Sequence, residues 1–265
     1  MGKDSRIDWT HHTFNPWWGC AKVSSGCANC YAEVWAARMG MRRWSADGDR
    51  RFFGESHWQE PKRWNRKAER LQERQKVFCS SMADVFEKRD DLDPWRQRLW
   101  NLIAETPHLD WLLVTKRPDH VREMVPWGSC WPSNVWLGMT AENQECAARR
   151  LPMLLEIPAR VRFVSCEPLV GPLDIGPWIG ANGLDWVIVG GESGARARPM
   201  KPEWVEHIHK QCSEAGTAFF FKQWGIFGGD GLRRSKKENG NLFQGRQWQE
   251  FPSPQRSSSM LCHGI

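Results

Sequence analysis

The chain has 265 residues, of which 26% are charged and 40% hydrophobic, and its formal net charge is +6 at pH 7, which is ordinary for a soluble globular protein. No apolar run approaches the roughly 18 residues that a membrane-spanning helix needs. The first residues lack the apolar core of a secretory signal, so we expect a cytoplasmic protein without a membrane partner.

Short runs rich in β-branched and aromatic residues recur along the chain, and helical patterns lie between them. The candidate strands are residues 6–14, 76–81, 110–115, 134–139, 161–166, 185–190 and 217–222. Residues 93–106 have a proline at a helix start, and residues 201–216 begin with Pro202 and end at Gly216. The alternation predicts a parallel sheet in an α/β protein. Six or seven such units fit a full or partial (β/α) barrel, and a doubly wound open sheet is the alternative.

The predicted barrel occupies residues 1–225. Residues 40–75 interrupt the alternation with a basic and aromatic insertion, and residues 226–265 are rich in glycine, serine, lysine and arginine. We expect this C-terminal extension to be only partly ordered, with a frayed end from Pro252.

Three of the nine cysteines, Cys20, Cys27 and Cys30, form a C-x6-C-x2-C pattern, and the others are scattered singly. A structural zinc could take these three thiolates and either His11 or His12. A [4Fe–4S] cluster on three thiolates instead leaves one iron open. An open iron can chelate the amino and carboxylate groups of S-adenosylmethionine, so the missing ligand favours this cofactor. Zinc and unligated thiols are the alternatives.

Polar residues follow the candidate strands, where α/β proteins carry their sites. They are Asp84, Lys116, Arg117, Thr140, Glu142, Asn143, Glu167, Glu192, Ser193, Lys222 and Gln223. Asp84 could accept hydrogen bonds from a ligand ammonium or ribose, or cap a helix. Lys116 and Arg117 suit a carboxylate or phosphate, unless both are simply solvated. Thr140, Glu142 and Asn143 suit ribose hydroxyls, unless Thr140 caps a helix.

Two further motifs offer catalytic and cofactor-binding residues. In "SCEP", Cys166 could donate a hydrogen atom to a substrate radical, with a buried structural thiol as the alternative, and Glu167 is restrained by the proline that follows it. In "GGES", Gly190 and Gly191 permit a close approach of the backbone to a ligand, and Glu192 lies beside it.

Five segments carry a family resemblance. "NPWWGCAKVSSGCANCYAE", "FVSCEPLVGP", "DWVIVGGESGARARPM", "FFFKQWG" and "GRQWQEFP" resemble the phage-associated three-Cys-motif proteins, which are related to radical SAM enzymes. The resemblance runs from about Asp8 to Pro252. It implies an incomplete TIM-like barrel of the radical SAM type, a [4Fe–4S] cluster and S-adenosylmethionine, and it supplies no substrate.

The commonest radical SAM pattern is C-x3-C-x2-C. In this chain six residues, and not three, separate the first two cysteines. Asn29 replaces the usual aromatic residue before the third cysteine, and Tyr31, the only tyrosine, could contact the adenine instead. "CSSMAD" stands where a Gly-Gly-Glu motif normally follows the second strand. Which S-adenosylmethionine bond is cleaved therefore stays open.

The leading hypothesis is a radical SAM-like enzyme that uses S-adenosylmethionine and an external one-electron reductant to modify or repair a substrate. The phage setting implied by the resemblance favours a nucleic acid base or nucleotide. Residues 40–58 interleave arginines with aromatic rings, which suits phosphate contact and base stacking, unless the rings pack onto the barrel. The alternatives are a zinc-stabilised nucleic-acid-binding module without catalytic activity and an iron–sulfur protein with a structural cluster.

Overall fold

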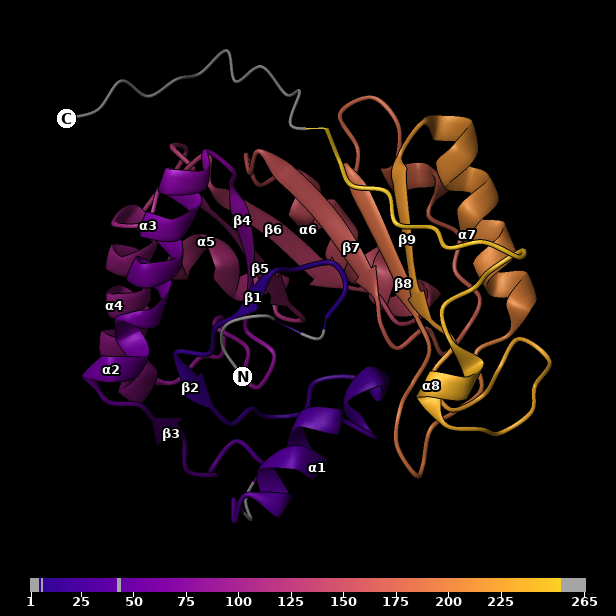
Figure 1. The fold of residues 1–265 in the computed structure, drawn as a ribbon, viewed down its shortest axis with the longest axis horizontal. Helices are drawn as coiled ribbons and strands as arrows, with labels where there is room; N and C mark the ends of the chain where they lie inside the picture. The colour runs from indigo at the N-terminus through magenta and orange to yellow at the C-terminus, as the bar shows by residue number, and fades with distance from the viewer. Residues whose placement is uncertain (1–4, 6, 42–43, 254–265) are drawn as a thin grey trace.

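The computed structural model describes residues 5, 7–41 and 44–253. Its main sheet has seven strands in the order β1-β4-β5-β6-β7-β8-β9, and every neighbouring pair is parallel (Figure 1). The strands are β1 His12–Thr13, β4 Gln75–Cys79, β5 Leu109–Thr115, β6 Val135–Thr140, β7 Val161–Cys166, β8 Trp186–Gly190 and β9 Ala218–Gln223. A doubly wound sheet reverses its strand order at a switch point, and this order never reverses. The predicted incomplete (β/α) barrel is confirmed, and the doubly wound alternative is wrong.

The candidate strands after the first differ from the observed strands by at most two residues at each end. The first was predicted too long, because only His12–Thr13 pairs with β4. The residues before this strand form a turn, in which the Thr10 backbone N–H donates to the Ile7 carbonyl oxygen. A small antiparallel ladder joins β2 Trp17–Trp18 to β3 Arg51–Phe52.

The helices of 12 or more residues connect the strands and cover the convex side of the sheet, whereas two short helices lie beyond the carboxyl ends of the strands (Figure 1). The α-helices are α1 Tyr31–Arg38, α2 Glu55–Trp58, α3 Glu60–Leu71, α4 Asp93–Ala104, α5 Val121–Met124, α6 Gln144–Leu155, α7 Pro202–Ala215 and α8 Lys236–Asn239. Short 3₁₀ helices are η1 Ser25–Cys27, η2 Asp90–Leu92, η3 Pro118–His120 and η4 Gly176–Trp178. Within the described ranges, no helix is both long and apolar enough to cross a bilayer.

The two faces of the sheet bury different side chains, because successive residues of a strand point to opposite faces. The convex face packs against the helices in the larger core cluster. The concave face carries an aromatic cluster that includes Trp9, Phe78, Phe163, Trp186 and Phe220. Trp9 and Phe78 also line the cavity at the carboxyl ends of the strands, so this cluster forms the floor of that cavity.

The chain after β9 returns to cover the free edge of that strand. The Phe221 N–H donates to the Trp248 carbonyl oxygen at 2.8 Å, and the Glu250 N–H donates to the Phe219 carbonyl oxygen at 3.1 Å. An edge strand that is paired in this way offers fewer free backbone groups to another chain.

Replacement of Gly216 by alanine is expected to lower the free energy of unfolding by about 1 kcal/mol, since its φ of +65° at the end of α7 disfavours any side chain. Gly54 is the matched control, because it has a φ of −76° and nothing lies within 4 Å of a Cβ built on it. Urea denaturation of Gly216→Ala and Gly54→Ala measures both effects. Equal losses in the two variants would contradict the argument.

Candidate functional site

The carboxyl ends of the strands surround a cavity of about 150 Å³. Asp84 follows β4, Lys116 follows β5, Thr140 ends β6, Glu167 follows β7 and Lys222 lies in β9, and all five line the cavity. Parallel strands bring their carboxyl ends to one edge, which explains why residues so distant in sequence meet here.

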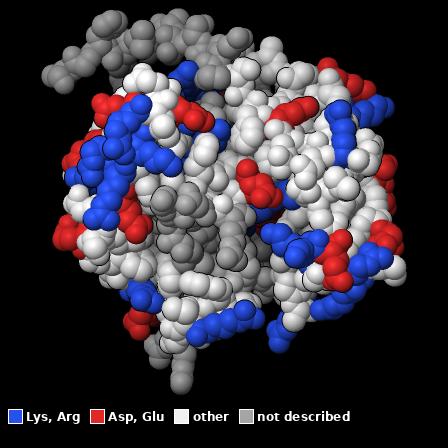
Figure 2. All heavy atoms as spheres, viewed as in Figure 1, with Lys and Arg blue, Asp and Glu red and all other residues white. Residues whose placement is uncertain are grey.

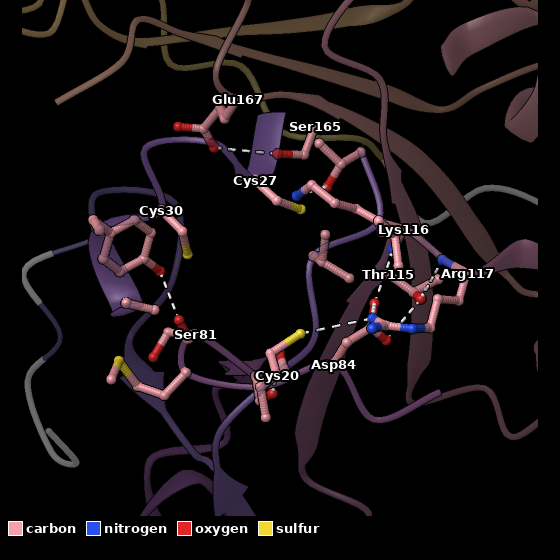
Figure 3. A pocket seen from close by; sticks show the side chains of 18 of the residues that line it. Cys20, Cys27, Cys30, Ser81, Asp84, Thr115, Lys116, Arg117, Ser165 and Glu167 are labelled. Atoms are coloured by element: carbon pink, nitrogen blue, oxygen red, sulfur yellow. Dashed lines mark hydrogen bonds and ion pairs between the residues drawn. The ribbon is translucent and has the colours of Figure 1, made fainter. Parts of the chain in front are cut away.

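The N-terminal segment from Gly19 to Cys30, named here the cysteine loop, lies across this cavity. Cys20, Cys27 and Cys30 all line it, and their sulfur atoms point toward one open space (Figure 3). Gly19 has a φ of +117°, and a Cβ there would lie 2.6 Å from Arg50 Cδ, so the start of the loop requires glycine. The loop then forms η1 and ends at Cys30, which precedes the first residue of α1.

The three thiols are suited to metal ligation. Burial raises the pKa of the Cys20 thiol to about 12, although the nearby Arg117 cation opposes this shift. Burial also raises the pKa of the Cys30 thiol. A thiol that stays protonated at neutral pH is a poor nucleophile, whereas a bound metal ion displaces its proton. The raised pKa values therefore argue against reactive free thiols at Cys20 and Cys30, and the case for ligands rests on the three sulfur atoms that face one cavity.

The histidines that zinc would need, His11 and His12, do not line the cavity with the cysteines. His11 Nδ1 accepts a hydrogen bond from the Lys76 backbone N–H at 2.8 Å. His12 Nε2 bonds Gln75 Oε1 at 2.7 Å, and its ring stacks on Trp64. Among the residues that the structure describes, no group of three His, Cys, Asp or Glu side chains is close enough to hold one metal ion. Three thiols around a wider space fit a four-iron cluster, whose irons each take a separate thiolate.

Asp84 lines the cavity, but the protein itself uses its carboxylate. It accepts hydrogen bonds from the Thr115 hydroxyl at 2.8 Å and from the backbone N–H groups of Phe86 and Lys116. Arg117 Nη1 donates to it at 2.9 Å and also lies 3.7 Å from Cys20 Sγ. No helix starts at Asp84, so the alternative of a helix cap is wrong. The carboxylate instead orients Arg117 toward the cysteine loop.

Lys116 and Thr140 face the cavity together. Lys116 Nζ donates to the Thr140 hydroxyl at 3.2 Å. Within the described part of the chain, this ammonium is half-buried and has no acidic partner within ion-pair distance. A half-buried cation that only a hydroxyl contacts is suited to an anionic group of a ligand.

Neither Glu142 nor Asn143 lines either of the cavities at this end of the sheet. Glu142 is fully buried and accepts hydrogen bonds from Arg150 Nη1 at 2.6 Å, from the Gly26 N–H at 3.2 Å and from the Ser24 hydroxyl. Asn143 caps α6, because its side-chain oxygen accepts from the Cys146 N–H. The expectation that these two side chains contact ribose hydroxyls is corrected, since both are used within the protein.

Gly190 ends β8, and Gly191 and Glu192 follow it. A Cβ at Gly190 would lie 2.8 Å from Glu167 Oε1, and one at Gly191 would lie 1.8 Å from the Trp224 carbonyl oxygen. The glycines are therefore required by the protein's own packing. Glu192 forms an ion pair with Arg198 at 2.6 Å and accepts from Asn29 Nδ2 at 3.1 Å.

A second cavity, of about 120 Å³, adjoins the first. Cys30, Tyr31, Lys116, Glu167 and Lys222 line both cavities. Glu167 and Lys222 form an ion pair at 2.6 Å, so their charges offset each other between the two spaces. The Tyr31 hydroxyl donates to the Ser81 carbonyl oxygen at 2.9 Å, which fixes the ring at the edge of the site.

Cys166 does not face the cavity. It is fully buried in the core between sheet and helices, and Ser165 lines the cavity instead. The expected role of Cys166 as a hydrogen-atom donor is therefore wrong. The alternation of side chains along β7 predicts this placement, because Phe163 and Ser165 point to the concave face and Cys166, the next residue, points to the opposite face.

Residues 40–58 form less of a surface than their sequence suggests. Arg50 and Trp58 are buried, and Phe52 stacks on the Trp95 ring at 4.5 Å. Arg42 and Arg43 lie outside the described residues. Trp44 lines the cavity and Arg51 is exposed. On the face shown in Figure 2, the largest group of basic side chains lies at the upper left of the view, over α3, whereas α1 lies at the bottom.

Comparisons with known proteins follow from this geometry. The profile of one family, described as "Protein of unknown function (DUF5131)", matches residues 4–252. A comparison with curated proteins finds no match. Among solved structures, that of a mutant of spore photoproduct lyase is similar with a TM-score of 0.50 and 10% sequence identity, over 83% of this chain and 78% of that chain. At this identity the likeness concerns the fold alone, which is a partial (β/α) barrel in this chain.

Proposed function

The chain belongs to the DUF5131 family, and we propose that it is an iron–sulfur enzyme of the radical SAM type. The observation that carries this proposal is the convergence of Cys20, Cys27 and Cys30 on one cavity at the carboxyl end of a seven-stranded partial barrel. The likeness to a lyase of similar fold supports an enzyme. The zinc-stabilised binding module has less support, because His11 and His12 are engaged at β1.

The residues present fit a [4Fe–4S] cluster held by the three cysteines. When bound there, it would offer an open iron to the amino and carboxylate groups of S-adenosylmethionine and deliver the electron for its cleavage. Lys116 would pair with the carboxylate, and Thr140 would orient Lys116 through its hydroxyl. Tyr31 would lie against the adenine, since its ring is fixed between the two cavities. Glu167 and Lys222 would enclose the reacting part of the ligand and exclude water.

We propose a nucleic acid base or a nucleotide as the substrate. The support comes from the rim of the cavity, where Trp44 is available for stacking. Arg51 is exposed and lies 4.9 Å from the centroid of the Trp18 ring, and Trp44 packs against the apolar cluster that contains Trp18. Lys22 also lines the cavity, although its ammonium pairs with Glu33 at 2.6 Å.

The test is anaerobic purification followed by iron and sulfide analysis. The expected result is a brown protein with about four iron atoms per chain. Adding S-adenosylmethionine should change the electron paramagnetic resonance spectrum of the reduced protein, since it would bind the open iron. A structural cluster with no open iron would leave that spectrum unchanged. Stoichiometric zinc without iron uptake would overturn the proposal.

Chromatography after reduction with dithionite then identifies the cleaved bond. We expect 5′-deoxyadenosine, and recovery of methylthioadenosine would keep the cofactor but change the reaction type. Labelled oligonucleotides and free nucleotides, titrated at two salt concentrations, test the substrate class, because phosphate contacts weaken steeply with salt. Absence of binding at low salt would remove nucleic acid from the proposal.

A further inference from the structure

We propose that three buried carboxylates hold the cysteine loop in its metal-binding geometry before any metal binds. These residues, Glu87, Glu142 and Glu192, are named here the carboxylate clamp. Each is paired with an arginine, and each contacts a different part of the loop. The inference rests on the proposed function in that it takes Cys20, Cys27 and Cys30 as the ligands.

Glu142 holds the middle of the loop. Its carboxylate accepts from the Gly26 N–H at 3.2 Å and from the Ser24 hydroxyl, one and three residues before Cys27. A Cβ at Gly26 would lie 2.7 Å from Glu142 Oε1, so the backbone approaches as closely as only glycine allows. Arg150, which is also fully buried, donates to the other carboxylate oxygen at 2.6 Å. The loop is thereby fixed to the start of α6.

Glu87 holds the first part of the loop. Its Oε1 accepts from the Ala21 N–H at 3.1 Å, directly after Cys20. Arg50 donates to both of its oxygens, at 2.7 and 3.1 Å, with both side chains buried. Arg117 adds a second contact, because its Nη2 donates to the Ala21 carbonyl oxygen at 2.8 Å.

Glu192 holds the last part of the loop. It accepts from Asn29 Nδ2 at 3.1 Å, directly before Cys30. Its partner Arg198 donates to both carboxylate oxygens, and Arg198 Nη2 also donates to the Ser25 carbonyl oxygen at 3.0 Å. Each of the three cysteines is therefore next in sequence to a residue that donates a hydrogen bond to a buried carboxylate.

Neighbouring cations and hydrogen bonds favour the ionised form of two of these carboxylates, Glu142 and Glu192. Burial raises the pKa of Glu142, but the Lys116 and Arg150 cations and the Ser24 hydrogen bond outweigh it, so the pKa is lowered. The balance at Glu192 is similar, with the hydrogen bonds from Arg198 opposing burial. Charge-assisted hydrogen bonds are stronger than neutral ones.

If the cysteine loop became ordered only when the metal bound, the conformational entropy lost on ordering would weaken metal binding. The loop has little regular structure of its own, since η1 is a single turn. Its shape must therefore come from contacts with the barrel. The carboxylates follow β4, β6 and β8, so the rigid sheet sets the spacing of the three ties. The clamp positions the thiols and touches no reacting atom.

Ser24→Ala tests the clamp, because it removes the hydroxyl that contacts Glu142, and with it a 3.8 Å contact to Cys27 Sγ, while the Glu142–Arg150 pair stays intact. Ser25→Ala is the matched control, since Ser25 is the next residue, is exposed, and its hydroxyl makes no hydrogen bond to the described residues. In the metal-free full-length chain, we expect amide hydrogens of residues 21–30 to exchange on the order of tenfold faster in Ser24→Ala than in Ser25→Ala. After reconstitution, we expect Ser24→Ala to lose iron to a chelator on the order of tenfold faster.

Asn29→Ala gives the same test at the Glu192 end, and its result decides the matter if Ser24→Ala does not fold. Equal exchange in the test and control variants overturns the clamp, whether or not iron binds. The two proposals can fail separately. If amide exchange in the loop is slow in the wild type and faster in Ser24→Ala, but the protein takes up no iron, the clamp is supported and the proposed function is overturned.

Discussion

A chain in which Cys20, Cys27 and Cys30 are all alanine is expected to take up no iron or sulfide above background, whereas the wild type should bind about four iron atoms. The three sulfur atoms point into one cavity, and the nearby histidines are engaged elsewhere. No other described side chains are grouped to replace the missing ligands. Iron and sulfide analysis after anaerobic reconstitution measures the loss.

Cys166→Ala is the matched control for this experiment. Its thiol is fully buried on the convex side of the sheet, so its removal should leave iron uptake unchanged. The triple variant should remain folded, since the three cysteines line a cavity and do not belong to the main hydrophobic core. Iron uptake by the triple variant equal to that of Cys166→Ala would show that these cysteines are not the ligands.

The cysteine spacing and the strand runs could be predicted because they are local patterns. The three thiols lie within a single loop, so their spacing already limits how far apart the sulfur atoms lie. The strands beyond the first are continuous apolar runs, as buried parallel strands are, and their ends were predicted within two residues. The ends of such strands then indicated where Lys116, Thr140 and Glu167 would meet.

The partners of the charged residues could not be predicted in the same way. The Ala21 N–H and Glu87 are 66 residues apart in sequence, and Ser24 and Glu142 are 118 apart. Neither local composition nor periodicity determines such contacts, which depend on how the loop crosses the finished barrel. For this reason Glu142 was expected at the ligand, although it supports the loop that carries the thiols.

Arg50 and Arg51 are adjacent in the sequence, which does not show that Arg50 is buried against a carboxylate while Arg51 is exposed. Replacing each of them should therefore change the stability by different amounts. Arg50→Gln is expected to lower the free energy of unfolding by about 3–5 kcal/mol, because it leaves the buried Glu87 carboxylate without its cationic partner. Arg51→Gln should cost only about 0.5–1 kcal/mol, since the exposed Arg51 guanidinium contacts the Trp18 ring from 4.9 Å.

Urea denaturation of the two variants, which differ by one position, measures this contrast. Arg50→Gln should also weaken iron retention, because Glu87 fixes the Ala21 N–H beside Cys20. Arg51→Gln should keep iron and instead lose affinity for oligonucleotides at low salt, if that exposed cation contacts phosphate. Two equally small losses of stability would mean that Arg50 is accessible to solvent, and the cysteine loop would then lack one of its three supports.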